Sequence, residues 1–211
     1  MTSLSTLARA ARLGAARKRG VTLIEAVLYI SIALALIVGG LVFFQQASLA
    51  QRTNSAVRNI SAIASETRGL YQSAQTFEGV SATTLINAGA VPTSIVRPSS
   101  TTGSVTTPAS LQNEWTGPIT VASVTPFTTF TVEYENIPTA ACTRLTSADA
   151  RGAGRVGSGI VSVAYRGSGD TSYAAGDVRL VGALDPDDVA GYCNTSAGTT
   201  GLVDVRFTFE R

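Results

Sequence analysis

A continuous apolar run from Val21 to Phe44, preceded directly by the basic residues Arg17, Lys18 and Arg19, constrains this chain most. The run contains one charged residue, Glu25. At about 1.5 Å per residue, a helix of this length can span a bilayer. A carboxylate within such a span costs about 2.5–3.5 kcal/mol near the centre and less near an end. An acid in this setting indicates a functional site at which a partner compensates the charge.

The basic residues before this run also change the charge balance of the chain. The formal net charge of the whole chain is +2, but residues 1–20 carry five basic residues and no acid. The rest of the chain therefore has a net charge of −3, which gives no electrostatic basis for binding nucleic acid. The chain has no histidine, the commonest general base and metal ligand. We expect no catalytic residues, no metal site and no cofactor.

Residues 1–20 are expected to form a removable leader, because they are basic and rich in small residues. A general secretory signal cleaved after Ala50 is one alternative, but the apolar region of such signals is about 7–15 residues long, shorter than this run. An uncleaved signal anchor is a second alternative. In each case the basic flank predicts a cytoplasmic N-terminus and export of the C-terminal part.

Helical periodicity continues beyond the apolar run. Residues 45–74 contain no proline, and their apolar residues keep helical spacing. We therefore expect one helix from about Thr22 to Ala74. Its residues 21–44 form a membrane-spanning half that is apolar on all sides, and residues 45–76 form an amphipathic half. The residues expected on the apolar side of that second half are Leu49, Ala56, Ile60, Ile63, Ala64 and Tyr71.

The remaining residues, 77–211, are expected to form a globular head. Alternating apolar residues predict strands at 119–124, 127–135, 159–165, 178–183 and 203–210. Short helices are expected at 81–90 and 138–148, and a polar loop at 97–110. In the second strand, Phe130, Val132 and Tyr134 alternate with Thr131, Glu133 and Glu135, which predicts one buried face. The strands are close in sequence and favour an antiparallel sheet covered by the amphipathic helix half, an α+β fold.

Cys142 and Cys193 are the only two cysteines. Together with the membrane-targeting N-terminus, they predict one disulfide formed in an oxidising compartment, and two free buried thiols are the alternative. Asp185, Asp187 and Asp188 are interpreted as a solvated turn rather than a calcium site. Trp115 is interpreted as a core residue near a turn rather than a surface anchor.

The sequence Gly20-Val-Thr-Leu-Ile-Glu25 before a long apolar stretch resembles the processing site of type IV prepilins. The resemblance implies that a membrane-embedded prepilin peptidase cleaves between Gly20 and Val21 and that Val21 then becomes N-methylated. It also implies that Glu25 is an assembly residue, which pairs with the new amine of a neighbouring subunit. Breaking a buried ion pair costs about 3–5 kcal/mol, so this pair can set the axial register of the subunits.

Other features resemble the type IVb class of these proteins. They are the 20-residue leader, Val at the new N-terminus, and the segment Leu111–Val121. That segment is similar to the Asn-x-Trp-Gly-Gly-x-Val element of bundle-forming and conjugative thin pilins, with Thr116 in place of the first Gly. The resemblance implies a pilin fold whose C-terminal region is stapled by a Cys142–Cys193 disulfide. Residues 143–192 resemble no family pattern.

The expected function is that of the major subunit of a type IVb-like pilus without enzymatic activity. Its partners would be the prepilin peptidase, the pilus assembly machinery and other copies of itself in a helical filament. It would lie in the inner membrane as a precursor, then in a pilus on a Gram-negative-type cell surface. The alternatives are a minor pilin or tip adhesin, a secretion-system pseudopilin, and an uncleaved signal-anchored periplasmic enzyme or binding domain.

Overall fold

The computed structural model describes residues 22–102, 105–147, 156, 159–173, 178–180 and 186–211. The chain divides into two compact units, residues 1–45 and 46–211. The helices are α1 (Leu23–Leu70), α2 (Ala82–Asn87), the 3-10 helix η1 (Thr93–Ile95), α3 (Thr139–Thr146) and α4 (Pro186–Ala197). The strands are β1 (Val96–Arg97), β2 (Ser100–Thr102), β3 (Val105–Thr107), β4 (Ser110–Gln112), β5 (Pro118–Val124), β6 (Thr129–Pro138), β7 (Ile160–Gly167), β8 (Val178–Leu180) and β9 (Leu202–Glu210).

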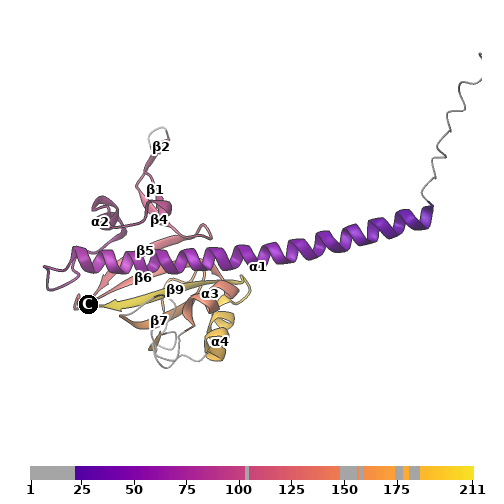
Figure 1. Cartoon of the computed structure of the whole chain (residues 1–211). Coiled ribbons are helices and arrows are strands. Elements are labelled where there is room, and N and C mark those ends of the chain that lie inside the picture. The colour runs from indigo at the N-terminus through magenta and orange to yellow at the C-terminus, as the bar shows by residue number, and fades with distance from the viewer. Residues whose placement is uncertain (1–21, 103–104, 148–155, 157–158, 174–177, 181–185) are drawn as a thin grey trace, which may run out of the picture. The chain divides into compact units, whose positions relative to one another are not determined.

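Helix α1 is continuous over 48 residues and ends four residues before the predicted end. Within residues 46–211 it lies along one face of the sheet (Figure 1). The part of α1 in this unit buries a stripe that recurs every three or four residues, as an amphipathic helix should. The stripe consists of Thr53, Ala56, Ile60, Ile63, Ala64 and Thr67. Leu49 and Tyr71 are partly buried against the same core, so the predicted amphipathic half is confirmed.

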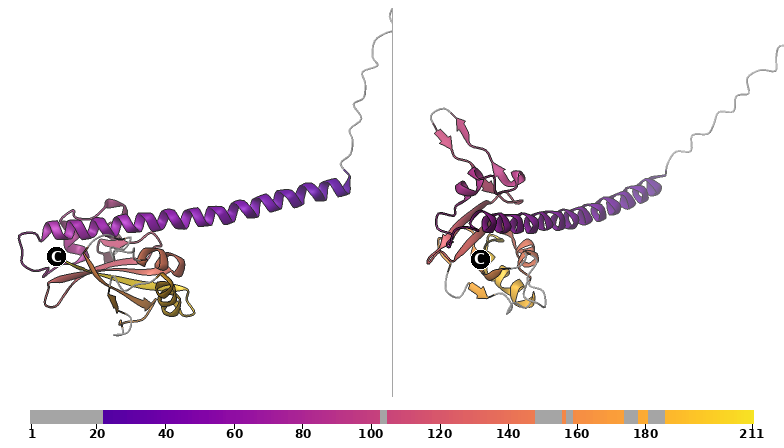
Figure 2. Two further views of the ribbon diagram at one scale, coloured as in Figure 1. Left: turned by 60° about the horizontal axis from the view of Figure 1, so that its bottom comes forward. Right: turned by 60° about the vertical axis from the view of Figure 1, so that its left-hand side comes forward.

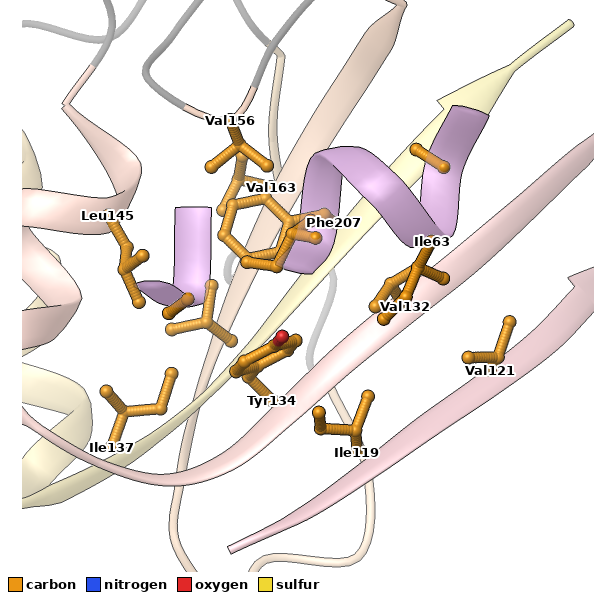
Figure 3. Close-up of a cluster of buried hydrophobic side chains, with 14 of the residues drawn as sticks. Ile63, Ile119, Val121, Val132, Tyr134, Ile137, Leu145, Val156, Val163 and Phe207 are labelled. Atoms are coloured by element: carbon orange, nitrogen blue, oxygen red, sulfur yellow. The ribbon is translucent and has the colours of Figure 1, made fainter. Parts of the chain in front are cut away.

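Seven strands form one sheet in the order β1-β4-β5-β6-β9-β7-β8, and every neighbouring pair is antiparallel. The antiparallel sheet predicted from the sequence is thus confirmed. The C-terminal strand β9 lies between β6 and β7, which places the last residues of the chain in the middle of the sheet. Ile63 of α1 packs over the face that carries Val132, Tyr134 and Phe207 (Figure 3).

The opposite face of the sheet is buried as well. Thr131 and Glu133 of β6 are only 8% and 7% exposed, so the prediction of a single buried face on this strand is wrong. Arg166 of β7 and Arg206 of β9 both bind Glu133, and the ring of Tyr173 covers the two guanidinium groups. Alternation of polar and apolar residues indicated two different faces, but charged residues can be buried when they are paired.

Residues 97–110, predicted as a polar loop, contain paired strands. Strand β1 pairs with β4, and β2 pairs with β3 as a separate two-stranded ribbon. Figure 2 shows this ribbon projecting from the edge of the head. Pro98 and Pro108 lie between the two pairs. Proline cannot donate a ladder hydrogen bond. One proline between β1 and β2 and one between β3 and β4 therefore account for the break in strand pairing.

The short helices differ in how far the sequence predicts them. Helix α2 begins after Ser81, whose side chain accepts a hydrogen bond from Thr84 N, as expected for a cap. Helix α3 lies within the predicted range, whereas α4 was not predicted. Asp187 and Asp188, interpreted as a solvated turn, lie in the first turn of α4, where the helix dipole favours acids. Asp185 lies outside the described residues.

Asn113 organises the turn between β4 and β5. Its side-chain oxygen accepts hydrogen bonds from the backbone nitrogens of Trp115 and Gly117, each at 2.9 Å. Its side-chain nitrogen donates to Glu135 O at 2.7 Å. A Cβ at Gly117 would lie 2.0 Å from that same carbonyl oxygen, so this position requires glycine. Thr116 has φ 69°, a left-handed conformation that glycine adopts more easily.

Replacing Thr116 with glycine is therefore expected to stabilise the head. The left-handed conformation costs a non-glycine residue about 1–2 kcal/mol, and the greater freedom of glycine in the unfolded chain offsets part of this gain. We expect Thr116→Gly to raise the free energy of unfolding by up to about 1 kcal/mol in denaturant titrations of the detergent-solubilised chain. Gly117→Ala is the matched control and should lower it. A Thr116→Gly variant less stable than the wild type would show that the left-handed conformation of Thr116 does not destabilise the head.

Candidate assembly site

Thr22 caps the N-terminus of α1. Its backbone oxygen accepts a hydrogen bond from Ala26 N at 3.0 Å, and its hydroxyl accepts one from Glu25 N at 3.3 Å. Thr22 and Glu25 thus have the spacing of a capping box. This role was not predicted from the sequence, although the Thr-x-x-Glu pattern is present there. The hydrogen bond uses the backbone of Glu25 and leaves its carboxylate available for another partner.

The carboxylate of Glu25 is exposed on the apolar part of α1. It accepts a long hydrogen bond from the Tyr29 hydroxyl, 3.5 Å to Oε1. Within the described residues, no ion pair includes Glu25. Gly20 and Val21, the predicted processing residues, lie outside the described residues.

Around Glu25, the helix exposes a large apolar surface. Its large apolar side chains between Leu23 and Phe44 are all at least half exposed. They are Leu23, Ile24, Val27, Leu28, Tyr29, Ile30, Ile32, Leu34, Leu36, Ile37, Val38, Leu41, Val42, Phe43 and Phe44. An apolar surface of this extent indicates a membrane or a protein partner. Helix α1 can cross a membrane by length and composition, a criterion that a secretory signal also satisfies.

The predicted disulfide between Cys142 and Cys193 is confirmed. It joins α3 to α4, and both sulfur-bearing residues are fully buried. The Cα atoms lie 6.0 Å apart, within the usual range for a disulfide. On chain-entropy grounds, a closed loop of this length stabilises the fold by about 4 kcal/mol. The bridge therefore anchors the segment from α3 to α4 at both ends.

A neutral network of four charged residues occupies the sheet face opposite α1. Arg166 binds Glu133 Oε1 at 2.6 Å and Asp204 Oδ2 at 3.0 Å, and Arg206 binds Glu133 Oε2 at 3.0 Å. Burial, together with the nearby Glu133 carboxylate, raises the pKa of the Tyr173 hydroxyl far above its usual range. The network thus holds Tyr173, which lies inside the disulfide loop, against the sheet.

The sequence does not predict this network, because its members come from three strands that are distant in sequence. The register of the paired strands brings these residues together. Glu133 lies opposite Arg206 across β6 and β9, and Arg166 lies opposite Asp204 across β7 and β9. The only feature of the sequence that could have indicated the network is the presence of charged residues at alternate positions of the predicted strands. That pattern is equally typical of a solvent-exposed face.

A polar hollow of about 410 Å³ lies between α1, η1 and the Asn113 turn. It is lined by Ser55, Arg58, Asn59, Ser94, Ile95, Gln112, Asn113 and Glu114. Asn59 Nδ2 donates to Glu114 Oε1 at 2.6 Å, which ties α1 to the turn. Burial raises the pKa of the Glu114 carboxyl, although hydrogen bonds and the charge of Arg58 oppose the shift. Trp115, next in sequence, is partly buried against the core and lines a separate hollow.

The described residues contain no group of three or more His, Cys, Asp and Glu side chains that could hold a metal ion.

A family described as PilS N-terminal matches residues 50–200 of this sequence. The chain belongs to this family. Its members are type IVb pilins, so the protein is a type IVb-like pilin subunit. The match covers the head up to Thr200, so it does not include β9, and it lies outside the apolar part of α1. No curated protein sequence matches the chain.

Among solved structures, the chain is similar to a type IV b pilin from Salmonella typhi. The two are 20% identical with a TM-score of 0.47, and the match covers 74% of this chain and 97% of that chain. Pilins are structural subunits that self-assemble into pili. The exposed apolar helix of this pilin fits a membrane-anchored precursor and a subunit of a surface pilus.

The raised pKa of Glu114 predicts how the stability of this pilin depends on pH. The folded state holds the proton of Glu114 at a pH where the unfolded state has released it. The contribution of Glu114 to stability is therefore present at low pH. It is lost as the pH rises from the usual pKa of the group through the raised value. Glu114→Gln removes this loss, since an amide has no charge to desolvate.

We expect Glu114→Gln to be more stable than the wild type at about pH 7.5, and the difference to shrink at about pH 4. Denaturant titrations at the two pH values measure this change. Glu66→Gln, at an exposed position of α1, is the control for the removal of one carboxylate. A constant difference at both pH values would show that Glu114 titrates normally.

Proposed function

We propose that this pilin is the major subunit of a type IVb-like pilus and polymerises through the N-terminal half of α1. The observation that carries the proposal is the exposed apolar helix with one acid, Glu25, that has no ionic partner among the described residues. Such a helix is stable in a bilayer or among copies of itself. Cleavage at the prepilin-like junction before this helix would allow it to pass from the bilayer into a bundle of its own copies.

Prepilin peptidase is proposed to cut between Gly20 and Val21, on the cytoplasmic side of the inner membrane. Cleavage removes the five basic residues of the leader and creates a positively charged amine on Val21, which is then methylated. Glu25 lies one helical turn further along, so the two groups of one chain are close in sequence. In a filament, Glu25 of one subunit would pair with the amine of a neighbour, and the disulfide-stapled head would lie on the filament surface.

The cost of a mismatched pair explains how this contact sets the register. Packing between apolar helices stabilises the filament, but its energy changes little when one apolar helix shifts along the axis of another. A subunit out of register would bury two unpaired charges, and breaking one buried pair costs about 3–5 kcal/mol. The ion pair thus selects one axial position among many that have similar apolar contact.

The native mature protein is expected to begin at an N-methylated Val21. Intact mass spectrometry and N-terminal sequencing of protein sheared from cells measure this directly. A chain that retains residues 1–20 would instead indicate an uncleaved signal-anchored periplasmic protein. A low abundance in sheared filaments would indicate a minor pilin or a pseudopilin. The first result would reject cleavage after Gly20, and the second would reject the role of major subunit.

Glu25→Ala and Glu25→Gln are both expected to abolish or strongly reduce surface pili, because each removes the charge that pairs with the amine. The yield of sheared filaments, relative to the processed pilin retained in the membrane, measures assembly. Thr22→Ala is the matched control, since it removes the helix cap, worth about 1 kcal/mol, and keeps the carboxylate. Normal assembly of Glu25→Gln would contradict the ionic mechanism.

A further inference from the structure

Tyr29 places a second polar side chain inside the apolar part of α1. It lies six residues after Leu23, the first residue of the helix, and fifteen residues before Phe44. Tyrosines of membrane proteins gather at the two interfaces, where the ring is in an apolar environment and the hydroxyl stays in water. Within an apolar span the hydroxyl needs a hydrogen-bond partner from the protein, because burial without one is costly.

The hydroxyl groups of residues 22–44 use two kinds of partner. The hydroxyl of Thr22 accepts a hydrogen bond from Glu25 N at 3.3 Å, and that of Ser31 donates to Leu28 O at 2.8 Å. Both of these hydroxyls are therefore satisfied by the backbone of the helix itself. The hydroxyl of Tyr29 instead reaches the side chain of Glu25, the single acid of this segment, 3.5 Å from Oε1.

Helix geometry accounts for this contact. Residues four positions apart lie on the same face of a helix, and long side chains lean toward its N-terminus. The side chain of Tyr29 therefore extends back over Glu25. The separation of 3.5 Å is longer than the about 2.5–2.7 Å of a close hydroxyl–carboxylate hydrogen bond. Both side chains are exposed, so small rotations about their torsion angles can shorten the contact.

We propose that Tyr29 is a positioning residue for assembly. Its hydroxyl binds Oε1 of Glu25 and leaves Oε2 for the amine of a neighbouring subunit. This inference rests on the proposed function, because it concerns the same ion pair. Ordering a flexible glutamate side chain costs conformational entropy, and a hydrogen bond made within the subunit orders the carboxylate before the neighbour arrives. The same bond supplies a donor to a charged oxygen in an apolar environment.

A neutral donor suits this role better than a cation. Residues 22–44 contain no lysine, arginine or histidine, so no side chain of that segment can form an ion pair with Glu25. A cation at position 29 would neutralise the carboxylate within one subunit, and a subunit out of register would then bury no unpaired acid. The phenol hydroxyl of Tyr29 donates one hydrogen bond and adds no charge at neutral pH. The amine of a neighbour therefore keeps its full ionic advantage in the correct register.

The first arm of the test measures the yield of sheared filaments relative to the processed pilin retained in the membrane. Tyr29→Phe keeps the aromatic ring and removes only the hydroxyl. We expect this variant to lower the filament yield about three- to tenfold, because it loses a hydrogen bond to a charged group. Ser31→Ala is the matched control. It removes another hydroxyl of the same segment, one that binds the backbone of the helix, and should leave the yield unchanged.

The second arm uses the detergent-solubilised full chain and requires no filament. The difference between the infrared spectra of the wild type and of Glu25→Gln isolates the carboxyl vibrations of Glu25. A hydrogen bond from Tyr29 changes the frequency of these vibrations. We therefore expect the Glu25 band to shift when the same difference is measured in a Tyr29→Phe background. In a Ser31→Ala background the band should stay where it is in the wild type.

Two results would overturn the positioning role. One is a normal filament yield from Tyr29→Phe together with a reduced yield from Tyr29→Leu or from neither variant, since the hydroxyl would then have no part in assembly. The other is an unshifted Glu25 band in Tyr29→Phe, which would show that the hydroxyl does not bind this carboxylate. Both results reject the role of Tyr29 alone when Glu25→Gln fails to assemble. Normal assembly of Glu25→Gln would instead reject the ionic mechanism of the proposed function.

Discussion

The contact between the second half of α1 and the apolar face of the sheet is the interaction on which the head depends. Strands β5, β6, β9 and β7 present a continuous apolar face that would be exposed without a cover. The stripe that includes Ala56, Ile60 and Ile63 supplies the cover, and all three residues are fully buried. The same helix has no such cover over residues 23–44. One element therefore stabilises the head and also carries the surface that needs a membrane or a partner.

The other side of the sheet is stabilised by different chemistry. The Glu133, Asp204, Arg166 and Arg206 network balances its own charge, and truncating Arg166 would leave the buried Asp204 carboxylate without an ionic partner. The disulfide holds α3 and α4 together at the two ends of the loop that carries Tyr173. The segment between the two cysteines resembles no pattern that the sequence alone suggested, but it lies within the family match over residues 50–200. In a pilin, a covalent staple and a buried ionic network suit a head that stays folded outside the cell.

Glu25 of this pilin is exposed on an apolar helix, and no ion pair includes it within the described residues. A carboxylate in a poorly solvated site is costly until a cation reaches it. If that cation is the amine of a neighbouring copy, as we propose, assembly relieves a cost that the isolated subunit bears.

Sequence alone determined the features that depend on local pattern. These are the helix from about residue 22, its change from wholly apolar to amphipathic, most strands, and the prepilin-like junction at Gly20. They follow from periodicity, length and a contiguous motif, which need no knowledge of distant contacts. The two cysteines could be paired because there is only one way to pair them.

Only the tertiary structure decided the features that depend on residues far apart in sequence. The insertion of β9 between β6 and β7 brings Arg206 to Glu133 and Asp204 to Arg166. The Asn113 turn against Glu135 O, and the unsatisfied oxygen of Glu114 beside α1, likewise need the folded chain. Strand order and burial are set by the sum of many weak long-range contacts, and no local pattern records that sum.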